Sequence, residues 1–122
     1  MQTVTEPAIP KPVVKELTEK DFDAEVLKAT VPVVVEFYSP DADSAPCAAL
    51  GPRFNAVAEK FDPRIRFMKV LRPGNPGLSE KLGVTASPTL VFFKGGKESG
   101  ERLTGDDIKR TAIKASVEAL LK

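Results

Sequence analysis

The chain has 122 residues, of which 42% are hydrophobic and 29% charged, and its formal net charge is +1. These values are typical of one soluble domain with a modest core, and they argue against a surface that binds nucleic acid or acidic membrane. The sequence has no histidine and one cysteine, which excludes Ser–His and Cys–His catalysis, histidine-ligated or cysteine-rich metal sites and an internal disulfide.

The N-terminal end of the chain is rich in proline. Residues 1–12 hold three prolines and few large apolar side chains, so we expect an extended or mobile tail before one domain over residues 13–122. The start lacks the pattern of a secretory signal, and no apolar run reaches the roughly 20 residues that span a bilayer. We therefore expect a cytoplasmic protein. A short strand at 13–17 should precede a helix that starts near Thr18.

The stretch from Val33 to Pro52 is the one around which the chain is organised. β-branched and aromatic residues at 33–38 predict a buried strand. After an acidic loop, a helix begins at Ser44, a residue type that caps helix N-termini, and Cys47 lies in its first turn. The helix dipole favours negative charge there, so the position suits a reactive sulfur. Pro52 lies inside this helix and should kink its axis.

The second half of the chain predicts further strands and helices. Strands are expected at 65–71 and 89–93, and a tight turn should lead into a final strand at 98–103. Helices are expected at 78–82 and from Asp106 or Asp107 to the C-terminus. Parallel β-α units followed by a hairpin and a closing helix predict an α/β three-layer sandwich around a central mixed β-sheet.

Taken in order, these features resemble the thioredoxin family from about residue 13 to the C-terminus. The residues that carry the resemblance are Val-Val-Glu-Phe-Tyr at 34–38, Pro46-Cys47, Pro52, Lys69, Ala-Ser-Pro-Thr at 86–89, Phe-Lys-Gly-Gly at 93–96 and Gly105. Each match alone is common, but their order and spacing together are specific. The resemblance implies the thioredoxin fold and a monomer that exchanges disulfides without a cofactor. Its implied partners are protein or peptide thiols and disulfides, with a thioredoxin reductase or glutathione in addition.

The chain departs from the family at the first reactive position. Family members attack with the first cysteine of a Cys-Gly-Pro-Cys motif and resolve with the second, whereas Ser44 and Cys47 stand at these positions here. A serine hydroxyl is too weakly acidic to ionise at neutral pH without a base, and it forms no mixed disulfide. We therefore expect weak or absent dithiol turnover. Cys47 is either a small core-facing residue or a thiol that a partner's disulfide can reach. Ser44 is either a helix cap or a hydrogen-bond donor to a bound group.

Glu36 and Lys69 are the next candidates. The resemblance places Glu36 where thioredoxins keep a buried acid that shuttles the proton of the second cysteine, with Lys69 on the neighbouring strand. A buried carboxylate is costly unless it is paired or protonated, so the two form either a proton relay or a structural ion pair. Asp41 and Asp43 resemble the start of an oxygen-rich metal loop, but the glycine and distal glutamate of a calcium hand are missing. We expect no metal site.

The loop around Pro88 is the expected peptide-binding element. The resemblance implies a cis bond before Pro88, and Ser87 would then pair its backbone with an extended peptide. The other positions that the resemblance places along this groove are Ala45, Pro46, Arg72, Thr104 and Gly105. Asp43, Arg72 and Ser87 stand where the family usually has apolar side chains. We therefore expect a more polar binding surface and different partners.

Three functions remain open. The first is a thioredoxin-family redox domain with a one-cysteine site. The second is a non-catalytic module that holds polypeptides in the Pro88 groove. The third is a single-thiol protein in which Cys47 forms mixed disulfides with glutathione or a partner. The polar groove and the missing attacking cysteine favour the second. The first and third are favoured by the residues retained from the family pattern, which are Glu36, Pro46, Pro52, Lys69, Pro88 and Gly105.

Overall fold

The computed structural model describes residues 14–39, 45–62, 64–105 and 108–121. In the helix that begins at Ala45, the side chains are described only from Leu50 on. The elements in chain order are β1 (Lys15–Glu16), the π-helical turn η1 (Asp23–Leu27), β2 (Val33–Tyr38), α1 (Ala45–Phe61), β3 (Arg66–Leu71), the 3-10 turn η2 (Arg72–Gly74), α2 (Pro76–Leu82), β4 (Thr89–Lys94), β5 (Lys97–Glu98), β6 (Leu103–Thr104) and α3 (Arg110–Leu120). No helix in these described ranges is long and apolar enough to cross a membrane.

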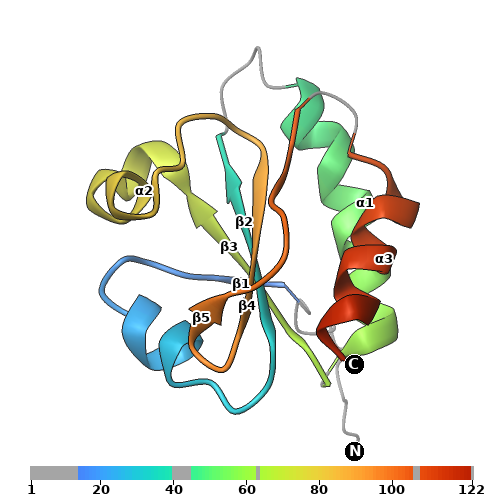
Figure 1. Ribbon diagram of the computed structural model, residues 1–122. Coiled ribbons are helices and arrows are strands. Elements are labelled where there is room, and N and C mark those ends of the chain that lie inside the picture. The colour runs from blue at the N-terminus through green and yellow to red at the C-terminus, as the bar shows by residue number, and fades with distance from the viewer. Residues whose placement is uncertain (1–13, 40–44, 63, 106–107, 122) are drawn as a thin grey trace, which may run out of the picture.

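The strands form one mixed sheet in the order β1-β3-β2-β4-β5, with β6 paired to β4. β3 runs parallel to β1 and β2, whereas β4 runs antiparallel to β2, β5 and β6. In Figure 1, α1 and α3 lie on one side of the sheet, and α2 and η1 lie on the other. This arrangement confirms the predicted α/β three-layer sandwich around a mixed sheet.

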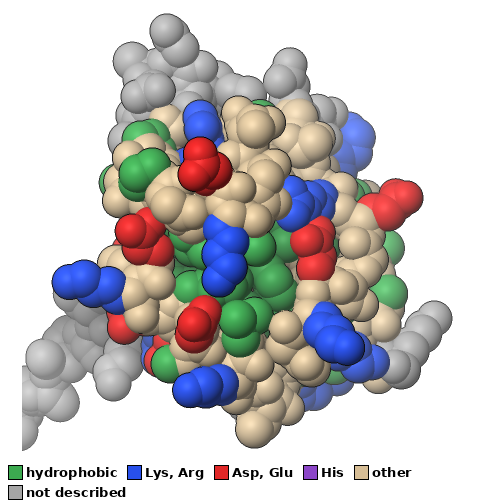
Figure 2. All heavy atoms as spheres, turned by 60° about the vertical axis from the view of Figure 1, so that its left-hand side comes forward, with side chains coloured by type: hydrophobic (Ala, Val, Ile, Leu, Met, Phe, Trp, Pro, Cys, Tyr) green, Lys and Arg blue, Asp and Glu red, His purple; other side chains and the backbone are tan. Residues whose placement is uncertain are grey.

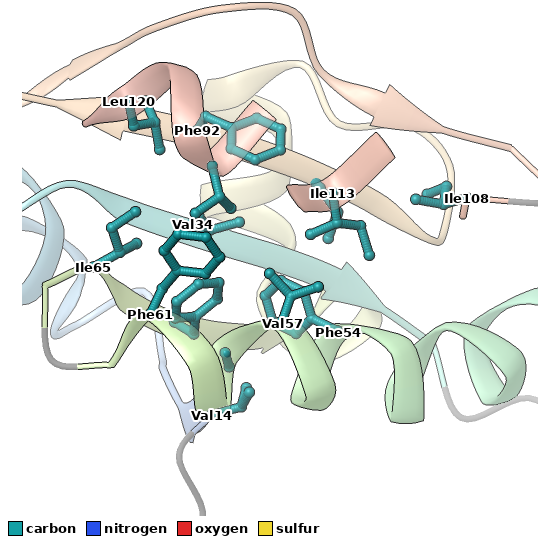
Figure 3. Close-up of a cluster of buried hydrophobic side chains, with 14 of the residues drawn as sticks. Val14, Val34, Phe54, Val57, Phe61, Ile65, Phe92, Ile108, Ile113 and Leu120 are labelled. Carbon is teal, nitrogen blue, oxygen red and sulfur yellow. The ribbon is translucent and has the colours of Figure 1, made fainter. Parts of the chain in front are cut away.

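Each face of the sheet has its own apolar core. Alternate residues of β2 point to opposite faces, so Val34 packs toward α1 and α3 while Val35 packs toward η1 and α2. The α1 side, drawn in Figure 3, includes an edge-to-face pair of Phe54 and Phe67 with ring centroids 5.5 Å apart. The outer surface on the α2 and η1 side carries charges of both signs, interspersed around visible apolar side chains (Figure 2). That face therefore has no field of a single sign.

The shortest elements differ from the sequence predictions. The first strand is only β1, not 13–17, and the helix expected from Thr18 is the later π-helical turn η1. The predicted strand at 98–103 is wrong, because β5 and β6 are separate strands of two residues each. Gly100 between them has φ +81°, a left-handed conformation that interrupts an extended strand.

Two helix starts also need correction. α2 begins at Pro76, two residues before the predicted start, because a proline in the first turn loses no helical hydrogen bond. The last helix, α3, begins at Arg110, and the predicted starts Asp106 and Asp107 lie outside the described residues. The helix that contains Pro52 does run continuously from Ala45 to Phe61.

Several segments that are far apart in the sequence meet at one end of the strands. Because β2 and β3 are parallel and β4 runs the other way, the carboxyl ends of β2 and β3 lie beside the start of β4. α1 begins shortly after β2 ends, and β6 pairs with the first residues of β4. These elements meet at the top of Figure 1. Among the predicted site residues that the structure describes, Arg72 follows the end of β3, Ser87 and Pro88 precede β4, and Thr104 and Gly105 lie at the end of β6.

Candidate functional site

Of the Ser-Ala-Pro-Cys sequence at 44–47, the structure describes only the backbone of the last three residues, which begin α1. Cys47 is the third residue of α1, so its backbone lies in the first turn as predicted. Ser44 lies outside the described residues, and so do the side chains of Ala45, Pro46 and Cys47. The expected burial of the Cys47 thiol and the expected cap by Ser44 therefore stay predictions.

Glu36 is a buried carboxyl group in the middle of the sheet. It lies two residues after Val34, so it shares the sheet face against which α1 packs. Only 5% of Glu36 is exposed. Burial raises the pKa of the Glu36 carboxyl from its ordinary 4.5 to about 7, although Lys69 lowers it and Glu16 raises it further. A carboxyl group with such a pKa can both accept and donate a proton near neutral pH.

Lys69 interacts with Glu36 through space rather than in a contact ion pair. The two residues lie opposite each other in the register of β2 and β3. However, within the described ranges no N–O distance of 4 Å or less joins them. The Lys69 ammonium lies instead 5.4 Å from the centroid of the Tyr38 ring, a cation–π geometry. The prediction of a neighbouring cation is thus correct in position, and its effect on Glu36 is electrostatic.

Glu16 and Tyr38 complete this cluster, and the sequence analysis missed both. The Tyr38 hydroxyl donates to the Glu16 carboxylate, with O–O distances of 2.9 and 3.0 Å. Burial and this hydrogen bond raise the pKa of Tyr38 to about 12. Glu16 lies opposite Lys69 in the register of β1 and β3. Glu16, Lys69 and Glu36 therefore form a row across three adjacent strands, which only the strand pairing reveals.

The loop before β4 is held by hydrogen bonds to two neighbouring segments. The Ser87–Pro88 peptide bond is cis. The Thr104 hydroxyl donates to the Pro88 carbonyl at 3.1 Å, and its oxygen lies 3.2 Å from that of Thr89. Gly105 follows with φ +115°, which side chains rarely adopt. The structure thus brings Ser87, Pro88, Thr104 and Gly105 together, as the sequence predicts.

Arg72 joins this loop from the end of β3. Its Nε donates to the Ser87 hydroxyl oxygen at 2.7 Å. This bond places a cationic and a hydroxyl group beside the cis peptide bond, in agreement with the expected polar surface. Within the same described residues, no group of three or more His, Cys, Asp or Glu side chains could hold a metal ion. Asp41 and Asp43 fall outside the described ranges.

Comparison with known proteins gives consistent matches over this fold. The family model described as Thioredoxin matches residues 13–119. The chain is 32% identical over 108 residues to "Thioredoxin" of Porphyra purpurea, covering 88% of this chain and 94% of the relative. It is 34% identical over 83 residues to "Thioredoxin 1" of Nostoc sp., covering 68% and 76% respectively. It is also 29% identical over 87 residues to "Thioredoxin" of Rickettsia bellii, covering 71% and 81%.

Proposed function

This chain belongs to the thioredoxin family, and on that premise we propose that it is a thiol–disulfide oxidoreductase-type protein with its attacking cysteine replaced by Ser44. The observation that carries the proposal is the Ser-x-x-Cys sequence at 44–47, whose last three residues begin α1. This helix packs on the side of the sheet that Glu36 faces. The fold and the Pro88 loop are those that the family uses for disulfide exchange. Its substrates would be protein or peptide thiols and disulfides.

The loss of the first thiol limits the chemistry to one step. If Cys47 is reachable, its thiolate attacks a partner's disulfide, forms a mixed disulfide with one sulfur and releases the other as a thiol. A second thiol of the protein would normally break that mixed disulfide, but Cys47 is the single cysteine of the chain. Release then requires an external thiol, such as glutathione. We therefore propose that dithiol turnover is weak or absent.

Glu36 is the group that we propose to accept the proton of Cys47. A carboxyl with a pKa of about 7 is partly ionised at neutral pH, so it can take a proton from a thiol and return it. It faces the α1 side of the sheet. Lys69 and Glu16 act on it in opposite directions, so they would tune this proton transfer without touching the sulfur.

Restoring the missing thiol tests the proposal. We expect the chain as given to reduce insulin no faster than dithiothreitol alone, and Ser44→Cys to accelerate the reaction by at least an order of magnitude, because it restores the two-thiol mechanism. Ser44→Ala is the matched control, which changes the same position without adding a thiol. Insulin reduction by the unaltered chain would show that Ser44 does not abolish turnover. An inactive Ser44→Cys variant would contradict the proposed redox scaffold.

The reactivity of Cys47 needs a separate measurement. Because the chain has one cysteine, any thiol label reports on this residue alone. We expect slow labelling in native buffer at neutral pH and fast labelling in denaturant, as for a buried resolving cysteine. Rapid labelling of the folded protein would favour the single-thiol function instead. Cytoplasmic localisation, the monomeric state and a reductase partner stay predictions.

A non-catalytic peptide-binding module is the second candidate. The Arg72–Ser87 hydrogen bond favours it. Both side chains are polar groups at the loop that disulfide exchange does not need, and the bond holds them in place. On this proposal both the unaltered chain and Ser44→Cys would be inactive on insulin, yet would bind an extended peptide with equal affinity. Loss of all peptide binding in both proteins would contradict it.

A further inference from the structure

Arg72 is held in a defined position next to the cis peptide bond. Its carbonyl accepts hydrogen bonds from the Asn75 N–H at 3.2 Å and the Ser79 hydroxyl at 3.4 Å, which fix its backbone. Its Nε donates to the Ser87 hydroxyl at 2.7 Å, which fixes the plane of its guanidinium group. Arg72 and Ser87 are both half-buried. An arginine with its stem so fixed has already lost much of the rotamer entropy that binding would cost.

The rest of the guanidinium group is available. Arginine has five N–H donors in a rigid fork, and the Nε–H bond to Ser87 uses one of them. In the described part of the chain, the Arg72 side chain has no other hydrogen bond and no ion pair. The backbone N–H and carbonyl of Ser87 also have no partner there. Within these described residues, the guanidinium group of Arg72 thus has unused N–H donors, and it is bonded to a residue, Ser87, whose own backbone groups are also unused.

We propose that Arg72, positioned by Ser87, selects extended peptides that carry an aspartate or glutamate beside the residue that pairs with Ser87. The backbone of Ser87 would pair with the peptide backbone, and the outer amino groups of Arg72 would bind the peptide carboxylate in a two-pronged geometry. This inference rests on the proposed function, because it assumes that peptides bind at the Pro88 loop. It adds the chemical class of the substrate, which is an acidic polypeptide segment.

The preference for carboxylate follows from the shape and charge of the donor. The planar fork of arginine matches a carboxylate with two parallel hydrogen bonds, whereas the amide of glutamine offers one acceptor oxygen. Charge-assisted hydrogen bonds are also stronger than neutral ones. A glutamate peptide and its glutamine counterpart have nearly the same size and backbone, so they isolate this contact from the rest of the binding surface.

The test compares two labelled peptides that differ by one residue. Both are short, extended and contain S-methylcysteine, so no disulfide can form, and one carries glutamate where the other carries glutamine. We expect the unaltered chain to bind the glutamate peptide about five-fold more tightly in fluorescence anisotropy, with the difference reduced at high salt. Arg72→Gln should abolish the difference, Arg72→Lys should retain part of it, and Ser87→Ala should reduce it. Arg110→Gln is the matched control at the exposed start of α3.

Several results would overturn the inference. Equal affinity for the two peptides, no binding of either, or a preference that survives in Arg72→Gln would each do so. Arg72-dependent binding of glutathione without a preference for the acidic peptide would show that the ligand of Arg72 is not an acidic polypeptide segment. Activity of Ser44→Cys on insulin is measured in parallel. An active variant without peptide discrimination contradicts only this inference, and an inactive variant with discrimination contradicts only the redox proposal.

Discussion

Two glutamates of the sheet respond to the fold in opposite ways. Glu36 lies on the central strand β2 and is buried, and its pKa rises from 4.5 to about 7 although a lysine lies on the neighbouring strand. Glu98 lies on the edge strand β5, and a hydrogen bond from Arg102 lowers its pKa below 4.5. Nε and Nη2 of Arg102 contact the two Glu98 oxygens at 2.7 and 2.9 Å.

The difference shows that burial outweighs the neighbouring charge when the cation makes no contact. Desolvation is the largest influence on Glu36, and the through-space attraction of Lys69 only partly opposes it. At Glu98 the order is reversed, because solvent remains close and the cation donates directly. Keeping Glu36 buried therefore lowers the stability of the fold at neutral and alkaline pH, where the carboxyl would be ionised in the unfolded chain. The two sites should give opposite dependences of stability on pH.

Replacing Glu36 should have the largest effect. Its raised pKa means that its stabilising contribution is complete below pH 4.5, where the carboxyl is protonated in both states, and is lost as pH rises to about 7. The difference between 4.5 and about 7 corresponds to about 3 kcal/mol. We expect Glu36→Gln to be more stable than the unaltered chain at pH 8 by up to this amount, and similar at pH 4. Urea unfolding across this range measures it.

The same variant separates the structural cost of Glu36 from its proposed role. In the Ser44→Cys background, Glu36→Gln should slow insulin reduction near neutral pH, because the amide cannot accept a proton. Glu59→Gln on the exposed side of α1 is a control for loss of one carboxylate. If Glu36→Gln leaves the pH dependence of stability unchanged, then Glu36 is not a buried carboxyl with a raised pKa.

Removing Lys69 should widen the difference in pKa between the buried Glu36 and the exposed Glu98. Without this cation the pKa of Glu36 should rise above about 7, so the loss of stability would extend to higher pH. We expect Lys69→Gln to lower the free energy of unfolding by about 1 kcal/mol at pH 8 and by less at pH 4, where Glu36 is neutral. Urea unfolding at both pH values is the measurement. An equal loss at both would mean that Lys69 acts through packing on Tyr38 and not through Glu36.

The long elements could be predicted from the sequence because their residues favour one structure on their own. The β-branched and aromatic run at 33–38 coincides with β2, and Gly83 ends α2 in the left-handed conformation. β1, β5 and β6 have two residues each. Such strands are defined by their pairing and not by composition, so no local pattern could place their ends.

In the candidate site too, some features could be predicted from the sequence and others could not. The burial of Glu36 follows from its place in an apolar strand, and the Pro88 loop follows from the family resemblance. The Tyr38–Glu16 hydrogen bond joins residues 22 positions apart, and it depends on the register of β1 against β3. The Arg72–Ser87 bond likewise depends on the direction of one side chain. Contacts of this kind follow from tertiary packing, so the sequence indicated polarity but not the partners.

Replacing Glu16 should change the ionisation of Tyr38 with little effect on stability. Tyr38 is the single tyrosine of the chain, so its phenolate absorbance reports one titration. We expect a midpoint near 12 in the unaltered chain and a lower midpoint, still above 10, in Glu16→Gln. Burial, the largest cause of the raised pKa of Tyr38, remains in the variant, whereas the negative charge that opposes ionisation is removed. Stability at pH 7 should change by less than about 1 kcal/mol, because the bond is exposed. Circular dichroism at each pH verifies that the fold persists, and a midpoint near 10 in the unaltered, folded chain would contradict the Tyr38–Glu16 hydrogen bond.

Glu98→Gln should have the smallest effect and the opposite sign of pH dependence. The lowered pKa of Glu98 means that its contribution is present above pH 4.5 and is lost as pH falls below that value. Because Glu98 is exposed, we expect a loss of only a few tenths of a kcal/mol at pH 7 and none at pH 3. Arg102 also donates to the Leu82 carbonyl at 2.6 Å, so Arg102→Gln should cost more than Glu98→Gln by breaking this link to α2. Equal losses from the two variants in urea unfolding would mean that the ion pair, and not the link to α2, is what Arg102 contributes.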